Sequence, residues 1–319
     1  MPAVLKGTAI TESKMRVRTP MKRNVKENLE LYAIMLPTIV LIIIFMYIPM
    51  YGIVIAFQDY IPGAPFFGAA TKWVGLKHFI NFVKGEYFTR FLVNTLRLNT
   101  MSLLMGFWVP IAFALILNEL YGSRFKKFVQ TVSYLPHFIS SVVVAGMVLS
   151  FVSTDGIINQ LITVLGGTPQ AWNTNPTAFP WIFTLTGIWQ SFGWSSILYL
   201  ATISAIDPAL YEAADLDGAG RWKKIQYITL PHMLPLIAVQ LIFFVGGMLN
   251  SDTQMILLLY NPATYKTADT IGTFVYRQGL VGGQFSSASA AGLFMSILSF
   301  LLVYGSNYCS RKLSDYSLW

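Results

Sequence analysis

The chain has 319 residues, of which 55% are hydrophobic and only 11% are charged, and its formal net charge is +8 at pH 7. Together with a mean hydropathy of +0.56, this composition excludes an ordinary soluble domain. It indicates a polytopic protein that is embedded in a membrane.

The first part of the chain, residues 1–30, is predicted to form a cytoplasmic tail. It is polar, it carries seven Lys or Arg residues, and it has no small-residue cleavage site placed after a short apolar core. A cleaved signal peptide would need such a site, so none is expected here.

Six segments are long and apolar enough to cross a bilayer, which takes about 20 mostly apolar residues. We expect an all-α membrane protein with a six-helix transmembrane domain over residues 31–310 and a short cytoplasmic tail over residues 311–319. The six segments cover residues 33–57, 92–117, 134–152, 181–206, 233–250 and 287–308.

The distribution of Lys and Arg predicts the orientation of these helices. Fifteen of these residues lie in the tails and loops that are cytoplasmic if the N-terminus is inside, and six lie in the loops on the other side. Because basic loops are retained in the cytoplasm, the bias predicts that both termini are cytoplasmic. It also accounts for the net charge without a nucleic-acid partner.

The loop over residues 207–231 separates the fourth and fifth apolar segments and is cytoplasmic in this topology. Asp207 followed by Pro208 is typical of a helix start, since Asp caps free backbone N–H groups and Pro fits the first turn. We expect a short helix from about residue 208 to residue 216, ended by Gly218 and Gly220.

A second short helix is expected from Arg221 to Tyr227. Leu230 and Pro231 should then turn the chain back into the membrane. The loop would thus form a bent projection of two helices beneath the bilayer.

The last apolar segment carries small residues at four-residue spacing, namely Ala288, Gly292 and Ser296. They fall on one helix face and predict a seam against which another helix packs closely. The single cysteine, Cys309, allows no disulfide, and no metal site is predicted.

Within the loop, Glu212, Ala213 and Ala214 are followed by Gly218 and, after nine more residues, by an Ile-x-Leu-Pro ending at residues 228–231. This phased pattern resembles the EAA loop of permeases from type I ATP-binding cassette (ABC) importers. Other segments resemble the permeases of carbohydrate importers, in the branch of the lipo-oligosaccharide, aldouronate, rhamnogalacturonan and alginate systems. These segments are YIPMYGIVIAFQDY (47–60), WVGLKHF (73–79), FKKFVQTVSYLPHFIS (125–140), ILLLYNPATY (256–265) and VYRQGL (275–280).

The resemblance implies that the EAA loop docks in a cleft of a cytoplasmic ATPase and transmits closure of the ATPase dimer to the membrane helices. It also implies three kinds of protein partner: a homologous second permease subunit, two ATPase subunits, and an extracellular solute-binding protein. The expected location is the bacterial cytoplasmic membrane, in contact with lipid. The coupling residues implied are Glu212, Ala213, Ala214, Asp217, Gly218 and Arg221.

The chain contains no phosphate-binding loop of the G-x-x-x-x-G-K-[ST] type. We therefore expect no catalytic residues and no cofactor in this chain, which would be a transport subunit and not an enzyme. ATP and Mg would be bound by the partner ATPase.

Polar and aromatic residues inside apolar segments often mark a transport pathway, and the fourth segment is the richest in them. Sugars suit such a lining, because their C–H faces stack on aromatic rings and their hydroxyls need amide and hydroxyl partners. The same residues could instead form interhelical hydrogen bonds or anchor the interface. Arg97 could meet an acidic sugar, although snorkelling or pairing with a loop carboxylate is the stronger expectation. The pathway candidates are Ser140, Gln190, Ser191, Trp194, Tyr199, Gln240 and Asn250.

The function expected from the resemblance is import of oligosaccharides derived from acidic, uronate-containing polysaccharides such as alginate or pectin. Three alternatives remain open: an ABC permease for a solute other than a sugar, an ion-coupled secondary sugar carrier, and a membrane scaffold that does not transport. An ion-coupled carrier would need carboxylates inside the membrane, whereas Asp and Glu here fall almost entirely in tails, loops and segment ends.

Overall fold

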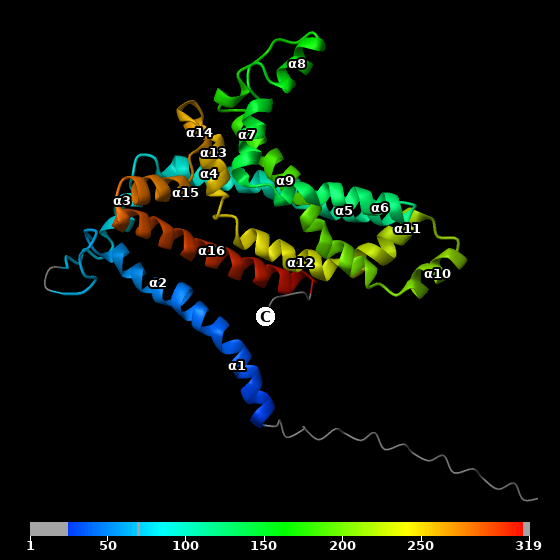
Figure 1. The fold of residues 1–319 in the computed structure, drawn as a ribbon, viewed down its shortest axis with the longest axis horizontal. Coiled ribbons are helices and arrows are strands. Elements are labelled where there is room, and N and C mark those ends of the chain that lie inside the picture. Colours follow the sequence, from blue (N-terminus) through cyan, green and yellow to red (C-terminus); the bar gives the residue numbers. More distant parts are fainter. Residues whose placement is uncertain (1–24, 69–70, 315–319) are drawn as a thin grey trace, which may run out of the picture. The chain divides into compact units, whose positions relative to one another are not determined.

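The computed structural model describes residues 25–68 and 71–314, and its contacts divide the chain into two units, residues 1–52 and 53–319 (Figure 1). Each unit is described separately. Most of the predicted N-terminal tail and residues 315–319 of the C-terminal tail lie outside the described residues.

The described part of the first unit is one continuous helix made of α1 (Val25–Ile42), the π-turn η1 (Ile43–Tyr47) and α2 (Ile48–Met50). A 3-10 segment, η2 (Tyr51–Phe57), continues it across the boundary between the units. Large apolar side chains cover this helix and are exposed, for example Ile34 at 75% and Phe45 at 70%. This agrees with the first predicted membrane segment, because a helix with apolar side chains on all sides suits a lipid environment.

The second unit contains helices throughout its described residues and no strand beyond one isolated bridge between Gln58 and Trp73. Its first half comprises α3 (Lys77–Val83), α4 (Phe88–Met101), η3 (Ser102–Gly106), α5 (Trp108–Glu119), α6 (Ser123–Tyr134), η4 (Leu135–Phe138), α7 (Ser141–Phe151), α8 (Ile157–Val164), η5 (Trp172–Thr174) and α9 (Phe179–Ser204). Its second half comprises α10 (Pro208–Leu216), α11 (Arg221–Lys224), η6 (Ile225–Thr229), α12 (Leu230–Gly246), α13 (Thr253–Leu259), η7 (Pro262–Thr264), α14 (Tyr265–Ala268), α15 (Ile271–Val275), η8 (Tyr276–Val281) and α16 (Phe285–Ser314).

Four of the predicted segments coincide with helices long and apolar enough to cross a membrane, namely Leu31–Phe57, Phe88–Glu119, Arg221–Gly246 and Phe285–Lys312. The protein is therefore all-helical in its described residues, with four such helices, or five if one bent pair is counted as a span.

The third predicted segment, residues 134–152, is not a single straight helix in the structure. The chain is helical from Ser123 to Phe138, bends by 100°, and continues as α7. Ile139 is extended at the bend, and the Ser140 hydroxyl accepts a hydrogen bond from the Val143 N–H at 3.4 Å, which caps a new helix. Pro136 in the preceding turn favours this break, because proline disturbs the regular helix ladder.

The fourth predicted segment corresponds to α9, which has 26 residues and a length of about 39 Å at 1.5 Å per residue. It contacts α4, α5, α6, α7, α12 and α13 and thus lies inside the helical assembly (Figure 1). Its buried polar residues include Thr184, Thr186 and Ser196. Because neighbouring helices cover part of its surface, α9 can carry the Ser, Thr, Gln and Gly residues that lower its hydropathy.

Close packing holds α9 against its neighbours. A Cβ atom added at Gly193 would lie 2.0 Å from the backbone oxygen of Ser133, so only glycine allows α6 to approach this near. On the other side, Tyr199, Ile203 and Met233 belong to a buried apolar cluster that joins α5, α9 and α12. These contacts fix the position of the polar face of α9.

The small residues predicted to form one seam on α16 have different surroundings. Ala288 is buried and packs close to Gly279 of η8, whereas Gly292 borders a cavity and Ser296 is exposed. The expected close packing is thus found at the first of the three positions.

Candidate functional site

The loop between α9 and α12 begins with the predicted helix. Helix α10 extends from Pro208 to Leu216, and the Asp207 carboxylate accepts a hydrogen bond from the Ala209 N–H at 2.9 Å. This is the cap expected from the Asp-Pro pair.

Gly218 ends α10 in the left-handed conformation, with φ of +72°. The N–H of Ala219 donates to the carbonyl of Ala214 at 2.9 Å, and the N–H of Gly218 donates to the carbonyl of Asp215 at 3.1 Å. These two bonds form a Schellman motif, in which glycine at this position avoids the steric penalty of a side chain. The glycine is therefore a conformational requirement of the loop.

The second helix of the loop does not end where the sequence predicted. From Arg221 it continues without a break to Gly246, so Leu230 and Pro231 do not turn the chain. A π-turn over Ile225–Thr229 ends two residues before Pro231. The wider turn contains the carbonyl four residues before the proline, and this accommodates the ring and the missing N–H within one helix.

Two side-chain contacts tie α10 to this long helix. The hydroxyls of Tyr211 and Thr229 are hydrogen-bonded at 2.9 Å, and Lys224 pairs with Asp215 at 2.7 Å. Since Thr229 is almost fully buried, the first contact anchors the loop to the body of the unit.

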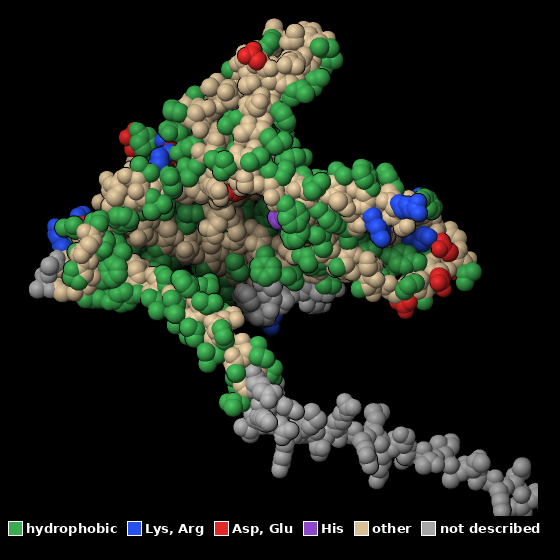
Figure 2. All heavy atoms as spheres, viewed as in Figure 1, with side chains coloured by type: hydrophobic (Ala, Val, Ile, Leu, Met, Phe, Trp, Pro, Cys, Tyr) green, Lys and Arg blue, Asp and Glu red, His purple; other side chains and the backbone are tan. Residues whose placement is uncertain are grey.

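Most of the predicted coupling residues lie on the outside of the loop. Glu212, Ala213, Asp217, Gly218 and Arg221 are exposed, and Ala214 is partly buried. Three apolar side chains beside them are also exposed: Leu216 at 91%, Trp222 at 74% and Tyr227 at 70%. Charged side chains of both signs gather at the α10–α11 end of the unit (Figure 2). The loop thus presents apolar and charged groups together to solvent.

Arg221 also connects the loop to the turn between α5 and α6. Its guanidinium lies 4.5 Å from the centre of the Tyr121 ring and donates a hydrogen bond to the Tyr121 hydroxyl. This contact holds Arg221 in position, and the residue remains exposed to solvent.

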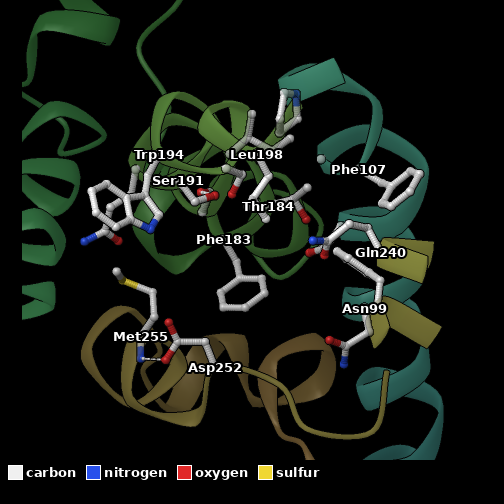
Figure 3. Close-up of a pocket in the computed structure, with 18 of the residues that line it drawn as sticks. Asn99, Phe107, Phe183, Thr184, Ser191, Trp194, Leu198, Gln240, Asp252 and Met255 are labelled. Carbon is white, nitrogen blue, oxygen red and sulfur yellow. Dashed lines mark hydrogen bonds between the residues drawn. The ribbon is translucent and has the colours of Figure 1, made fainter. Parts of the chain in front are cut away.

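A cavity of about 630 Å³ lies between α4, η3, α5, α9, α12 and α13 (Figure 3). Five of the seven predicted pathway residues line it: Gln190, Ser191, Trp194, Tyr199 and Gln240. The other two lie elsewhere. Ser140 caps α7, and Asn250 lines a second cavity of about 370 Å³.

The polar residues on α9 also make bonds within the protein. Gln190 donates to the carbonyl of Ile139 at 3.1 Å, which satisfies a backbone group freed by the bend after η4. Ser191 donates to the Gly187 carbonyl at 2.6 Å. The Trp194 ring stacks on His137 at 4.6 Å between centroids. Gln190 therefore both forms a hydrogen bond to a neighbouring segment and lines the cavity.

Further polar lining residues were not predicted: Asn99 and Ser102 from the α4–η3 region, Thr184 from α9, and Asp252, which caps α13. Asn99 donates to the Ser251 hydroxyl at 2.8 Å. Since Ser251 lines the second cavity, this hydrogen bond joins residues from the linings of the two cavities. Asn99 could have been found from the sequence, because it is a polar residue within a predicted apolar segment.

Two arginines outside the cavity, Arg90 and Arg277, share one carboxylate. Asp269 is fully buried and pairs with Arg90 at 3.2 Å and with Arg277 at 2.7 Å. Its other oxygen accepts a hydrogen bond from Thr273 at 2.6 Å. Arg97 is exposed and does not line the cavity.

Near α3, Asp59 pairs with Lys72 at 3.3 Å and with Lys77 at 3.0 Å. The hydrogen bond from Lys77 is the main cause that holds the pKa of Asp59 below its ordinary value. Lys72 and Lys77, both in a predicted outer loop, thus share one carboxylate.

Comparison with known proteins identifies the class to which this arrangement belongs. Residues 90–314 match the family described as the binding-protein-dependent transport system inner membrane component. The polygalacturonan/rhamnogalacturonan transport system permease protein YteP of Bacillus subtilis (strain 168) is 42% identical over 291 residues, covering 91% of this chain and 90% of that protein.

Two solved structures are similar over nearly their whole length. One is a bacterial ABC transporter involved in the import of the acidic polysaccharide alginate, with 43% identity and a TM-score of 0.83, covering 91% of this chain and 98% of that chain. The other is a bacterial alginate ABC transporter in complex with an alginate pentasaccharide-bound periplasmic protein, with 42% identity and a TM-score of 0.84, covering 92% and 98%.

Proposed function

Because this chain belongs to the family of inner membrane components of binding-protein-dependent transport systems, we propose that it is the permease through which an ABC importer takes up acidic oligosaccharides. It is a multi-pass protein of the bacterial inner membrane and a transport subunit, not an enzyme. The observation that carries the proposal is the cavity beside α9, lined by aromatic rings, amides and hydroxyls and flanked by the two helices that continue into the projecting loop.

The chemistry of the cavity supports a sugar as the solute. Trp194 and Phe183 offer ring faces for the C–H surface of a pyranose, and Gln240 and Asn99 offer amides for its hydroxyls (Figure 3). The acidic class is supported by the similar proteins, which are named for polygalacturonan/rhamnogalacturonan and for alginate. The substrate-pathway role of the lining residues is part of this proposal.

The geometry of the loop supports a coupling role. Since Arg221 and Gln240 lie on one continuous helix, about 28 Å apart at 1.5 Å per residue, movement of the loop is carried directly to the cavity. We infer that α10 docks on a partner ATPase through Glu212, Ala213, Leu216 and the neighbouring exposed groups. Closure of the ATPase dimer on ATP and Mg would then tilt α12 and reshape the cavity.

The same proposal includes six spans with both termini in the cytoplasm, with the bent α6–α7 pair as the third span and α9 as the fourth. Support comes from the length of α9, since about 39 Å exceeds the roughly 30 Å of bilayer hydrocarbon. The proposed partners are a homologous second permease, two ATPases and a solute-binding protein. A periplasmic protein bound to alginate pentasaccharide is present in one of the similar structures.

The test is reconstitution of the chain in proteoliposomes with the second permease, ATPases and binding protein encoded beside it. We expect uptake of an oligogalacturonide or an alginate oligomer that requires ATP inside the vesicles. Uptake driven by a proton or sodium gradient without the ATPases would refute the proposal, as would a complex that imports neither oligomer, whether as the free acid or as its methyl ester.

Docking is tested separately with Leu216→Asp, which places a charge on the 91% exposed position of α10. We expect loss of ATPase co-purification with unchanged yield of the permease. Val164→Asp is the matched control, because Val164 in α8 is also an exposed aliphatic residue, at 83%. Equal ATPase binding by both variants would argue against docking at α10.

A further inference from the structure

The large cavity has an unexpected charge for a protein proposed to carry acidic sugars. Of the residues that line it, Asp252 alone is charged, and neither Lys nor Arg is among them. The inference drawn from this rests on the proposed function, since it concerns how the same cavity selects its solute.

Asp252 is held in place by the start of α13. Its Oδ1 atom accepts a hydrogen bond from the Met255 N–H at 3.0 Å, as an N-terminal cap (Figure 3). It forms no ion pair with the Lys, Arg and His residues in the described ranges 25–68 and 71–314. The carboxylate is exposed and lies on the cavity wall across from the polar face of α9. Its negative charge therefore acts on whatever enters the cavity.

Positive charge that could offset Asp252 lies away from the cavity lining. Arg90 and Arg277 both pair with the buried Asp269, and neither lines the cavity. Arg97 is exposed outside the lining. A uronate carboxylate placed in this cavity would thus meet a like charge without a counter-charge from this chain, and two like charges at one site repel each other.

The same carboxylate is well suited to an uncharged sugar unit. An ionised carboxylate is an acceptor with two oxygens and several lone pairs, so it can accept hydrogen bonds from sugar hydroxyls. Phe183, Trp194 and Met255 line the same cavity and give it apolar surface. The combination matches a pyranose with free hydroxyls and an uncharged substituent at C5.

We propose that Asp252 is a specificity-determining residue that admits an uncharged sugar unit to this cavity and excludes a uronate carboxylate from it. The preferred solute is an oligosaccharide in which a neutral or esterified unit occupies the cavity, as in a chain of alternating acidic and neutral sugars or a methyl-esterified oligogalacturonide. The carboxylates of an acidic chain then lie outside this chain's cavity.

The experiment compares initial ATP-driven uptake of an oligogalacturonide with that of its fully methyl-esterified form of the same length, in proteoliposomes containing the whole complex. The variants are Asp252→Asn and Asp252→Ser, because both residues can still cap α13 while removing the charge. Asp155→Asn is the control, since Asp155 precedes α8 and does not line the cavity. The ratio between the two substrates is compared among variants, so that any preference of the binding protein cancels.

We expect both Asp252 variants to raise the acid-to-ester uptake ratio by about tenfold, and Asp155→Asn to leave it unchanged. An unchanged ratio in variants that still transport, or a ratio that falls, would overturn the role of Asp252 and leave the proposed function standing. Import of neither form by the unmodified complex would overturn the proposed function, and this inference with it.

Discussion

Gly218 provides the sharpest test of how the loop works, because its requirement is conformational and not steric. Its φ is +72°, and a Cβ atom added there would meet nothing within 4 Å. A side chain in the left-handed region costs about 1–2 kcal/mol. Gly218→Ala should therefore weaken the Schellman motif by that amount, and a cost of about 1.4 kcal/mol lowers the population of the capped loop relative to other conformations about tenfold.

The assay is the affinity of the purified permease complex for its ATPase subunit, measured together with ATP-driven uptake. We expect Gly218→Ala to weaken ATPase binding by up to about tenfold, while the thermal stability of the membrane part stays unchanged, since the loop end is exposed. Gly218→Asn should be affected less, because Asn tolerates the left-handed conformation better than Ala does.

Gly220 supplies the matched control two residues away. A Cβ atom added at Gly220 would also meet nothing within 4 Å, but its φ is −68° and it caps α11, a role that serine fills well. Gly220→Ser should bind the ATPase like the unmodified protein. If Gly218→Ala binds normally, or if Gly220→Ser is impaired to the same degree, the conformational explanation is refuted.

Three further predictions concern the packing and charges of the second unit. Gly193→Ala should destabilise the fold by at least about 1–3 kcal/mol, because its Cβ would lie 2.0 Å from the Ser133 backbone oxygen, whereas Gly146→Ala, with nothing within 4 Å, should not lower the melting temperature. Asp269→Asn should lower the free energy of unfolding by about 2–3 kcal/mol. This is at or below the lower end of the range for a broken buried ion pair, because the two arginines that contact Asp269 are about one-third exposed. A normal melting temperature of this variant would contradict the prediction. The pKa of Asp59 is lowered in the folded protein, so its contribution to stability is present above its unfolded pKa and is lost as pH falls through the folded value. Asp59→Asn should accordingly melt below the unmodified protein near neutral pH and converge with it under acidic conditions, and a constant difference across this range would contradict the assignment.

Local signals in the sequence predicted the loop well up to one point. The Asp-Pro start and the glycine stop of α10 depend on interactions within a few residues, so both were visible without the fold. The continuation of the second helix through Pro231 was not, since proline next to a polar stretch usually marks a turn. The π-turn that accommodates this proline depends on how α12 packs into the unit.

Polar residues in the fourth apolar segment led to the prediction of a transport pathway, and that role stays a prediction. That these residues line one cavity could be seen only in the folded structure, because residues of α4, α12 and α13 also line it. Asp252 is the clearest example of a lining residue whose position could not be predicted without the fold. In the sequence it is a carboxylate at the end of an apolar segment, and only the packing of α13 against α7 and α9 brings it to the cavity wall.

The sequence by itself determined that this is an all-helical membrane protein, where four of its apolar helices lie, and where α10 starts and stops. These features follow from hydropathy and from backbone preferences, which act over one helix or one turn. Only the tertiary structure decided the 100° bend after Phe138, the cavity and the pairing of Asp269 with Arg90, a residue 179 positions earlier. Such features depend on contacts between distant segments, and the energy of those contacts is set by burial and geometry that no local pattern contains.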